Sequence, residues 1–235
     1  MMRLIECKGL VMTDVESTSV EAVVSPLLDR EEARVIGCLM EKQVLTPEVY
    51  PLTLNAVMLA CNQKTSREPV MHLEEGAVGH CLRRLENKGL VSFVHSARAF
   101  RYDHRFDHVY QVTPPQRTVL ALLLLRGAQT APELLQRSER MHRFSDVEQL
   151  RDTLDRLARR SPALVVNLGH QAGQREDRYM HLLCGAVDPA QMGTRFGQEA
   201  AAAAPVDPDR YAALEARVAA LEASLQALKD KLGES

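Results

Sequence analysis

The sequence predicts a mainly α-helical α+β protein with small β-hairpins. The composition favours helices, because Leu, Ala, Val, Arg and Glu dominate and aromatic residues make up only 4% of the chain. Apolar residues also recur at helical spacing through most of residues 29–188. Along this stretch the order helix, helix, helix, strand, loop, strand occurs twice. We therefore expect two tandem winged helix-turn-helix domains followed by a C-terminal helix.

The first set of elements begins at "LLDREEARVIGCLMEKQ". Asp29 can cap this helix, and Glu32 three residues on completes a capping box. Two prolines in "TPEVYP" end the helix. Thr53 caps a second helix, and a third runs from about Glu74 to Lys88 with Gly89 at its C-terminal end. The segments "LVSFV" and "FRYDHRF" are predicted to be two short strands around a tight tip.

The second set of elements follows the same order. "PPQRTVLALLLLRG" is expected to be a buried helix that proline opens and Gly127 closes. Thr130 with Glu133, and Ser145 with Glu148, offer capping boxes for the next two helices. "LVVNL" and "DRYMHLLC" are predicted strands flanking a glycine-containing loop.

The inward-facing residues of the two third helices repeat at a constant offset of 72 positions. The sequence thus divides into a flexible N-terminal tail (1–28), a first winged-helix domain (29–113) and a second (114–188). The matching positions are Val78, Leu82 and Leu85 in the first domain and Leu150, Leu154 and Leu157 in the second.

Residues 189–210 are rich in small residues and proline and are predicted to be a linker, followed by a helix over 211–235. Apolar residues there alternate spacings of four and three over about three heptads. A coiled coil and a helix packed on its own domain both fit this seam. The seam consists of Leu214, Val218, Leu221, Leu225, Leu228 and Leu232.

Charge and cysteine content narrow the class of protein. The net charge is −2 and the pI about 6.5, so the chain is not the polycation typical of many nucleic-acid binders. The five cysteines form no C-x-x-C pair, which fits reduced thiols better than a secreted disulfide framework. The apolar run Val119–Leu125 is too short to span a bilayer. We expect a cytoplasmic protein without a membrane segment, whose start is either Met1 or Met12.

No motif indicates an enzyme or a bound cofactor. The sequence contains no phosphate-binding loop, dinucleotide fingerprint or nucleophile elbow. Cys61 lies on the apolar side of its helix, which favours a buried small hydrophobe over a nucleophile. His104 and His108 fall in or just after a strand, and His80 and Cys81 face different sides of a helix. We therefore expect no catalytic residue, no metal site and no cofactor.

The polar run "ACNQKTSREPV" falls in the turn before the third helix of the first domain. Its side chains could contact phosphate, or could satisfy one another and the free amides at the start of that helix. Basic residues gather on this turn and on the third helices and hairpins of both domains. The candidate nucleic-acid-binding residues are Lys64, Arg67, Arg83, Arg84, Lys88, Arg98, Arg101, Arg156, Arg159, Arg175 and Arg178.

Three long segments carry a resemblance to a known family. "ARVIGCLMEKQVLTPEVYPLTLNAVMLACNQKTSREPVMHL", "LLLRGAQTAPELLQRSERMHRF" and "GQREDRYMHLL" resemble the bacterial YceH family, over roughly residues 30–183. The resemblance implies tandem winged-helix domains and supplies no catalytic residues. The chain departs from the family in carrying Glu74 where members tend to have a capping serine. Gly76 and Gly79 also lie inside the third helix, which they weaken by about 1 kcal/mol each.

Two classes of function remain. The arginines on the third helices and hairpins favour a dimeric DNA-binding protein, such as a transcriptional regulator. The near-neutral charge favours a winged-helix module or scaffold that binds protein without touching DNA. Residues 29–113 carry 11 Lys and Arg against 11 Asp and Glu, a net charge of 0, and residues 114–188 carry 11 against 9, a net charge of +2. Of the two, we favour DNA binding and a homodimer.

Overall fold

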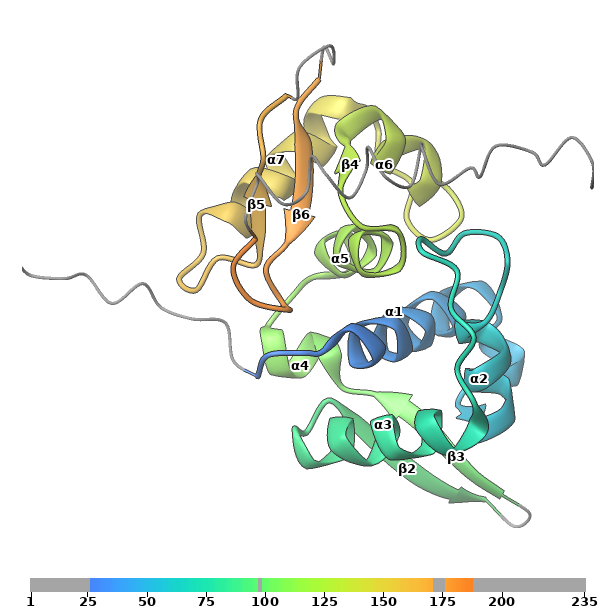
Figure 1. Cartoon of the computed structure of the whole chain (residues 1–235). Coiled ribbons are helices and arrows are strands. Elements are labelled where there is room, and N and C mark those ends of the chain that lie inside the picture. Colours follow the sequence, from blue (N-terminus) through green and yellow to red (C-terminus); the bar gives the residue numbers. More distant parts are fainter. Residues whose placement is uncertain (1–25, 97–98, 171–175, 188–235) are drawn as a thin grey trace, which may run out of the picture. The chain divides into compact units, whose positions relative to one another are not determined.

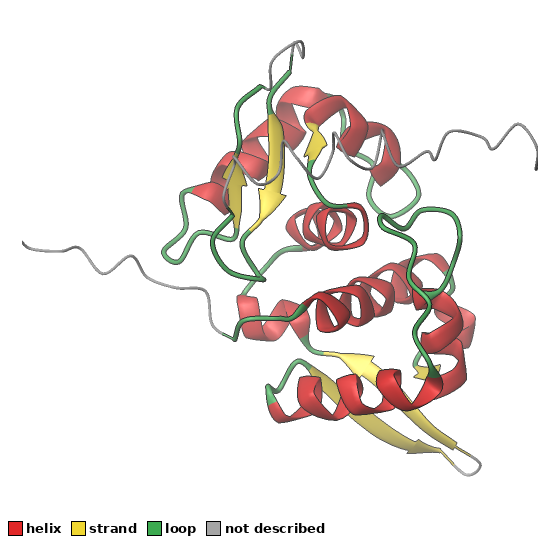
Figure 2. Cartoon of the chain, viewed as in Figure 1, coloured by secondary structure: helices red, strands yellow, loops and turns green. Residues whose placement is uncertain are grey.

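The computed structural model describes residues 26–96, 99–170 and 176–187 (Figure 1). Helices predominate, and the strands are short and antiparallel (Figure 2). The expected α+β class is therefore confirmed. The predicted N-terminal tail (1–28, apart from its last three residues), linker (189–210) and C-terminal helix (211–235) lie outside the described residues.

The first repeat consists of three main helices and a three-stranded sheet of order β1-β3-β2. The predicted hairpin is present, and its strands pair in the register Val91↔His104 to Ser96↔Ala99. The elements are α1 (Arg30–Leu45), η1 (Pro47–Val49), β1 (Leu52–Thr53), α2 (Leu54–Cys61), α3 (Glu75–Asn87), β2 (Val91–Ser96) and β3 (Ala99–His104).

The second repeat has the same element order and an equivalent sheet, β4-β6-β5. A short helix, α4 (Phe106–Tyr110), connects the two repeats. The elements of the second repeat are α5 (Pro114–Arg126), β4 (Gln129–Thr130), α6 (Ala131–Ser138), α7 (Val147–Ala158), β5 (Val165–Asn167) and β6 (Arg178–His181).

Local sequence signals set most helix starts. Asp29 and Glu32 form the expected capping box, as do Thr130 and Glu133, and the Thr53 hydroxyl accepts the Ala56 amide. The prediction for the third helix of the second repeat was wrong by one residue, because Asp146, not Ser145, caps α7.

The shift at α7 has a simple cause. The Asp146 carboxylate accepts the Gln149 amide at 2.8 Å, and the Gln149 side chain accepts the backbone N–H of Ser145 at 2.8 Å. Asp and Ser cap helices about equally well, so local spacing alone does not distinguish the two registers.

Three elements differ from what the sequence predicts. β1 and β4 are two residues long and exist because they pair with β3 and β6, so no local pattern marks them. α4 begins at Phe106, which the sequence places at the end of a strand. Phe106 and Tyr110 are both buried, one helical turn apart, with ring centroids 4.6 Å apart. Their burial in the core favours a helical turn over further strand.

One hydrophobic core runs through both repeats. α1 packs against α5 (Figure 1). At this contact Gly37 of α1 faces Leu124 and Leu125 of α5. A Cβ on Gly37 would lie 3.1 Å from the Leu125 side chain, which is closer than an ordinary contact, so Leu125 would have to shift by a few tenths of an ångström to admit it. The backbone N–H of Leu28 also donates to the Leu183 carbonyl at 2.8 Å. The two repeats share this core, so the structure does not divide them into separate domains. The predicted boundaries, 29–113 and 114–188, therefore stay predictions.

Replacing Gly37 with valine should destabilise the protein by about 2 kcal/mol, because the added methyl groups overpack the α1–α5 contact. Gly76→Val on α3 is the matched control, since nothing lies within 4 Å of a Cβ at that position. Urea unfolding of both variants measures the difference. Equal midpoints for the two variants would contradict the role of Gly37.

Candidate nucleic-acid interface

The polar run before α3 is held by two buried arginines. Arg67 is only 5% exposed, and its guanidinium forms a two-point ion pair with Glu41 of α1 at 3.1 and 2.5 Å. Its Nε also donates to the Ala60 carbonyl at 3.0 Å. The sequence predicts that Arg67 binds nucleic acid, and the structure instead places it inside the protein, where phosphate cannot reach it.

Arg34 of α1 holds the two ends of the same loop. It donates to the Cys61 carbonyl at 3.2 Å and to the Pro69 carbonyl at 2.6 Å, and its side chain is among the largest that are fully buried. The Glu68 amide donates to the Leu125 carbonyl of α5 at 2.9 Å. Of the two possibilities left open for the polar run, these contacts favour a turn that satisfies its own polar groups. Lys64 is the exposed cation of the run.

Some cations of α3 form ion pairs within the protein, and one lies exposed on its surface. Arg84 and Lys88 both reach Glu32, at 3.4 and 2.5 Å, and the Glu32 side chain is fully buried. Arg84 also pairs with Asp29 at 2.6 Å. Removing either cation would leave the buried Glu32 carboxylate less well compensated. Arg84 and Lys88 therefore stabilise the fold and are not free to bind a ligand. Arg83 remains exposed on α3.

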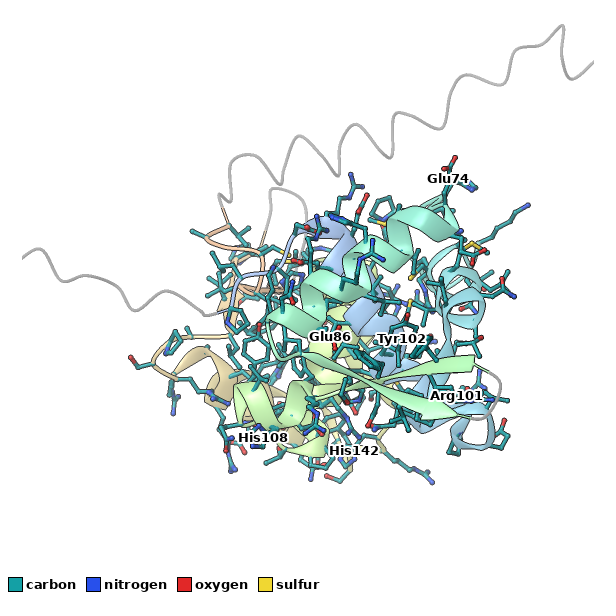
Figure 3. The ribbon with its side chains drawn as sticks, turned by 90° about the horizontal axis from the view of Figure 1, so that it is seen from below. Glu74, Glu86, Arg101, Tyr102, His108 and His142 are labelled. Atoms are coloured by element: carbon teal, nitrogen blue, oxygen red, sulfur yellow. The ribbon has the colours of Figure 1, made fainter. Side chains whose placement is uncertain are left out.

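The start of α3 is acidic. Glu74 occupies the N-cap position without a side-chain capping bond, and Figure 3 shows it pointing outward. Glu74 and Glu75 are both exposed. Despite Gly76 and Gly79, α3 is helical from Glu75 to Asn87. Two carboxylates at the end of a helix that would approach DNA oppose phosphate binding there.

Both hairpins contain a four-residue motif, Arg-Tyr-x-His, that was not among the sequence predictions. β3 contains Arg101-Tyr102-Asp103-His104, and β6 contains Arg178-Tyr179-Met180-His181, an offset of 77 residues. Arg101 donates to the Pro51 carbonyl at 2.7 Å, and Arg178 donates to the Ala128 carbonyl at 3.0 Å. Each carbonyl lies two residues before the threonine that caps the next helix. The two arginines therefore anchor equivalent strands. A search for R-Y-x-H repeats would have found them.

The histidines of this motif are buried and uncharged. Burial, together with the Arg117 guanidinium, lowers the pKa of His104 to about 4, and burial alone lowers the pKa of His181 to about 4. Nδ1 of His104 lies 3.3 Å from the Phe106 amide, so we assign the ring proton to Nε2, which lies 2.9 Å from the Gln43 side-chain oxygen. A second ring proton would displace the Phe106 contact.

The exposed face of α7 carries ion pairs within the helix. Arg156 contacts Asp152 at 2.7 Å and Arg159 contacts Asp155 at 3.5 Å, while Arg151 contacts Glu148 at 2.7 Å. The side chains of Arg156 and Arg159 are 70% and 82% exposed. These arginines are therefore within reach of a ligand and are held only by exposed partners.

Two further exposed arginines lie in the turn between α6 and α7. Arg140 and Arg143 flank His142, whose ring packs edge-on against the buried Phe144 at 4.7 Å between centroids. Neither arginine was among the predicted nucleic-acid-binding residues, although both lie just before a third helix, as Lys64 does in the first repeat. The candidates Arg98 and Arg175 lie outside the described residues.

The cysteines within the described ranges are free thiols, and most of them are buried. Cys38, Cys61 and Cys81 are buried and Cys184 is exposed, all as free thiols. Contact with Cys38 and burial raise the pKa of Cys61, as expected for a packed thiol. No cluster of three or more potential metal ligands occurs among the described residues. None of the helices in this part of the chain is long and apolar enough to cross a membrane.

Together these features define a class: an α+β protein of two equivalent three-helix, three-strand repeats with arginine-rich turns and third helices. Residues 28–174 match the family model described as "Protein of unknown function, DUF480", and the chain belongs to this family. The family expected from the sequence is thus confirmed. The chain is 50% identical over 222 residues to UPF0502 protein Smlt0097 of Stenotrophomonas maltophilia (strain K279a), covering 93% of this chain and 100% of that protein.

Other relatives match over most of their length. UPF0502 protein mll4256 of Mesorhizobium japonicum is 51% identical over 207 residues, covering 88% of this chain and 95% of that protein. A UPF0502 protein of Pseudomonas savastanoi pv. phaseolicola is 51% identical over 204 residues, covering 86% and 92% of the two chains.

Arg67→Ala should lower the free energy of unfolding by about 3–5 kcal/mol, because it leaves Glu41 buried without its partner. Arg83→Ala, which removes the same charge from the surface of α3, should change it by less than about 0.5 kcal/mol. Urea unfolding at neutral pH compares the two variants. A small effect of Arg67→Ala would show that the pair contributes little.

Stability should fall as the pH drops from about 6.5 toward 4. Both buried histidines have pKa values below that of the unfolded chain, so the unfolded state binds the extra protons first. The stabilisation is complete above the unfolded pKa and is lost progressively below it. The combined variant His104→Gln/His181→Leu should flatten the dependence of the urea midpoint on pH over this window. His80→Gln, on the exposed side of α3, is the control and should keep the wild-type slope.

Proposed function

We propose that both repeats are winged helices and that the protein is a non-enzymatic DNA-binding protein, such as a transcriptional regulator, which contacts DNA mainly through its second repeat. The order of helices and strands in each repeat supports this assignment. In a winged helix-turn-helix the third helix enters the major groove, and the turn before it and the hairpin approach the backbone. α7 and the α6–α7 turn would occupy those positions in the second repeat.

The observation that carries this proposal is the exposure of five arginines on α7, at its C-cap and in the turn that precedes it. All five are accessible, and the turn arginines have no ion pair among the described side chains. They lie at the places where phosphate contacts concentrate in helix-turn-helix proteins. The set consists of Arg140, Arg143, Arg151, Arg156 and Arg159.

The ion pairs on α7 do not prevent phosphate binding. Exposed pairs one helical turn apart contribute about 0.3–0.5 kcal/mol each, so an arginine can leave its carboxylate at little cost. The carboxylates lower the net positive charge, however. We therefore expect moderate affinity that depends strongly on salt.

The first repeat is less suited to phosphate. Arg84 and Lys88 compensate the buried Glu32, Arg67 is buried, and Glu74 and Glu75 begin α3. Arg101 bonds the Pro51 carbonyl in the first repeat, and Arg178 likewise anchors the second. Among the described candidates of the first repeat, Lys64 and Arg83 are exposed, and we assign them a supporting role.

A second candidate function is a protein–protein interaction module or scaffold that does not touch DNA. The near-neutral first repeat favours it, as does the exposure of Phe93, Val94 and Phe100 on its hairpin. Contiguous exposed apolar groups mark partner-binding surfaces more often than single exposed side chains do, and the Phe93 and Phe100 rings are in contact. We also propose a cytoplasmic location, supported by the four free thiols in the described residues, and a homodimer.

The test is fluorescence anisotropy with labelled genomic DNA fragments across a range of salt concentrations. The logarithm of the binding constant should fall linearly with the logarithm of salt. Arg140→Ala/Arg143→Ala should reduce the slope by about 0.9 for each phosphate that these arginines neutralise in the wild type, and should weaken binding to all sequences alike.

Arg30→Ala/Arg105→Ala is the matched control, because it removes the same charge from exposed positions of the first repeat. It should leave the slope near the wild-type value. Absence of binding by the intact protein at low salt would exclude the DNA-binding proposal and leave the protein-interaction module. Equal slopes for the two double variants would exclude the α6–α7 turn as the region that contacts DNA.

A further inference from the structure

The β2 strand differs from the other edge strands of the two sheets in length and exposure. The sheet order β1-β3-β2 leaves β2 with a single neighbour among the described residues (Figure 1). β2 extends over six residues, Val91–Ser96, whereas the other edge strands β1, β4 and β5 have two, two and three. Very short edge strands are one way in which proteins avoid pairing with other chains, and β2 is not protected in this way.

β2 also lacks the other usual protections of an edge strand. Its sequence, Val-Ser-Phe-Val-His-Ser, contains no lysine, proline, glycine or acidic residue. In natural sheets, charges, prolines and bulges on an edge strand prevent the addition of another strand. Among the described residues, no strand pairs with the outer backbone edge of β2, and nothing in its sequence opposes such pairing.

Apolar side chains are exposed on both sides of the strand. Phe93 is 48% exposed on the side that carries Tyr102, and Val94 is 50% exposed on the opposite side, where Arg101 is its partner across the ladder. Phe100 of β3 is 54% exposed, and its ring lies edge-on to Phe93 at 5.8 Å between centroids. A ligand that covered one face only would leave either Phe93 or Val94 in water, whereas an added strand covers part of both.

We propose that β2 is a self-association strand: the β2 strands of two copies of this chain pair antiparallel about a two-fold axis and join two three-stranded sheets into one of six strands. A two-fold axis perpendicular to the sheet necessarily makes the paired strands antiparallel, as all strands of this sheet already are.

Charge favours a second copy as the occupant. Because β2 carries no Lys, Arg, Asp or Glu, pairing it with itself places no like charges opposite each other. A symmetric register centred on Phe93 or on Val94 would place that apolar residue opposite its own copy at the two-fold axis, with the other apolar residue one position away on the opposite face of the sheet. A charged peptide or the DNA backbone would find no opposite charge on β2. Since one strand pair buries little area, the dimer belongs to the weak, reversible class.

Sedimentation velocity of the full chain without DNA tests the proposal over a concentration series. The wild-type mass should rise from 26.2 kDa toward twice that value. Val94→Lys should weaken the dimer by at least about tenfold, because it places two like charges near the two-fold axis. Leu59→Lys, at a 59% exposed residue of α2, is the matched control and should dimerise as the wild type does. Thermal unfolding checks that both variants fold.

Amide hydrogen exchange gives a readout specific to strand pairing. Protection of the peptide containing Val91–Ser96 should increase with concentration in the wild type and not in Val94→Lys. A wild type that stays monomeric, or protection of β2 only on addition of DNA, would overturn the proposal. So would a dimer that survives Val94→Lys and is lost in Leu221→Asp/Leu225→Asp, which would place the interface in the C-terminal segment. None of these outcomes depends on whether the second repeat binds DNA.

Discussion

The packing of α1 against α5 is the contact on which the rest of the structure depends. Gly37 allows the two helices to approach closely, with the Leu125 side chain in the space that a Cβ would need. This contact merges the cores of two repeats, each of which would be small on its own. Burial of shared apolar surface is the dominant stabilising term, so the repeats stabilise each other. The same helices position the polar loop before α3, through Glu41 on α1 and the Leu125 carbonyl on α5.

The two repeats have the same anchoring residues and different surfaces. The R-Y-x-H motif ties β3 and β6 to equivalent carbonyls, and its histidine is buried in both. In the first repeat the cations of α3 largely compensate buried or capping carboxylates, and the hairpin exposes apolar side chains. In the second repeat the arginines of α7 and of the turn before it lie in water. This division supports the proposal that the first repeat mediates association and the second contacts DNA.

The fold could be predicted from the sequence because its signals are local. Helix caps at Asp29, Thr53 and Thr130 depend on residues within one turn, and the buried positions of α3 and α7 follow the helical period. The two-residue strands β1 and β4 could not be predicted, because they exist only through pairing with strands about 50 residues away. The turn into α4 likewise depends on the core that buries Phe106 and Tyr110.

The sequence by itself determined the α+β class, the order of the main helices and hairpins, and the family. Which arginines could meet a ligand was decided only by tertiary structure. Arg67 and Arg83 look alike in the sequence, yet Arg67 faces Glu41, which lies 26 residues away in the chain. The physical reason is that a guanidinium loses its water when buried and must then be paired within the protein. Its partners come from other elements, so burial and pairing are fixed by packing and not by local sequence.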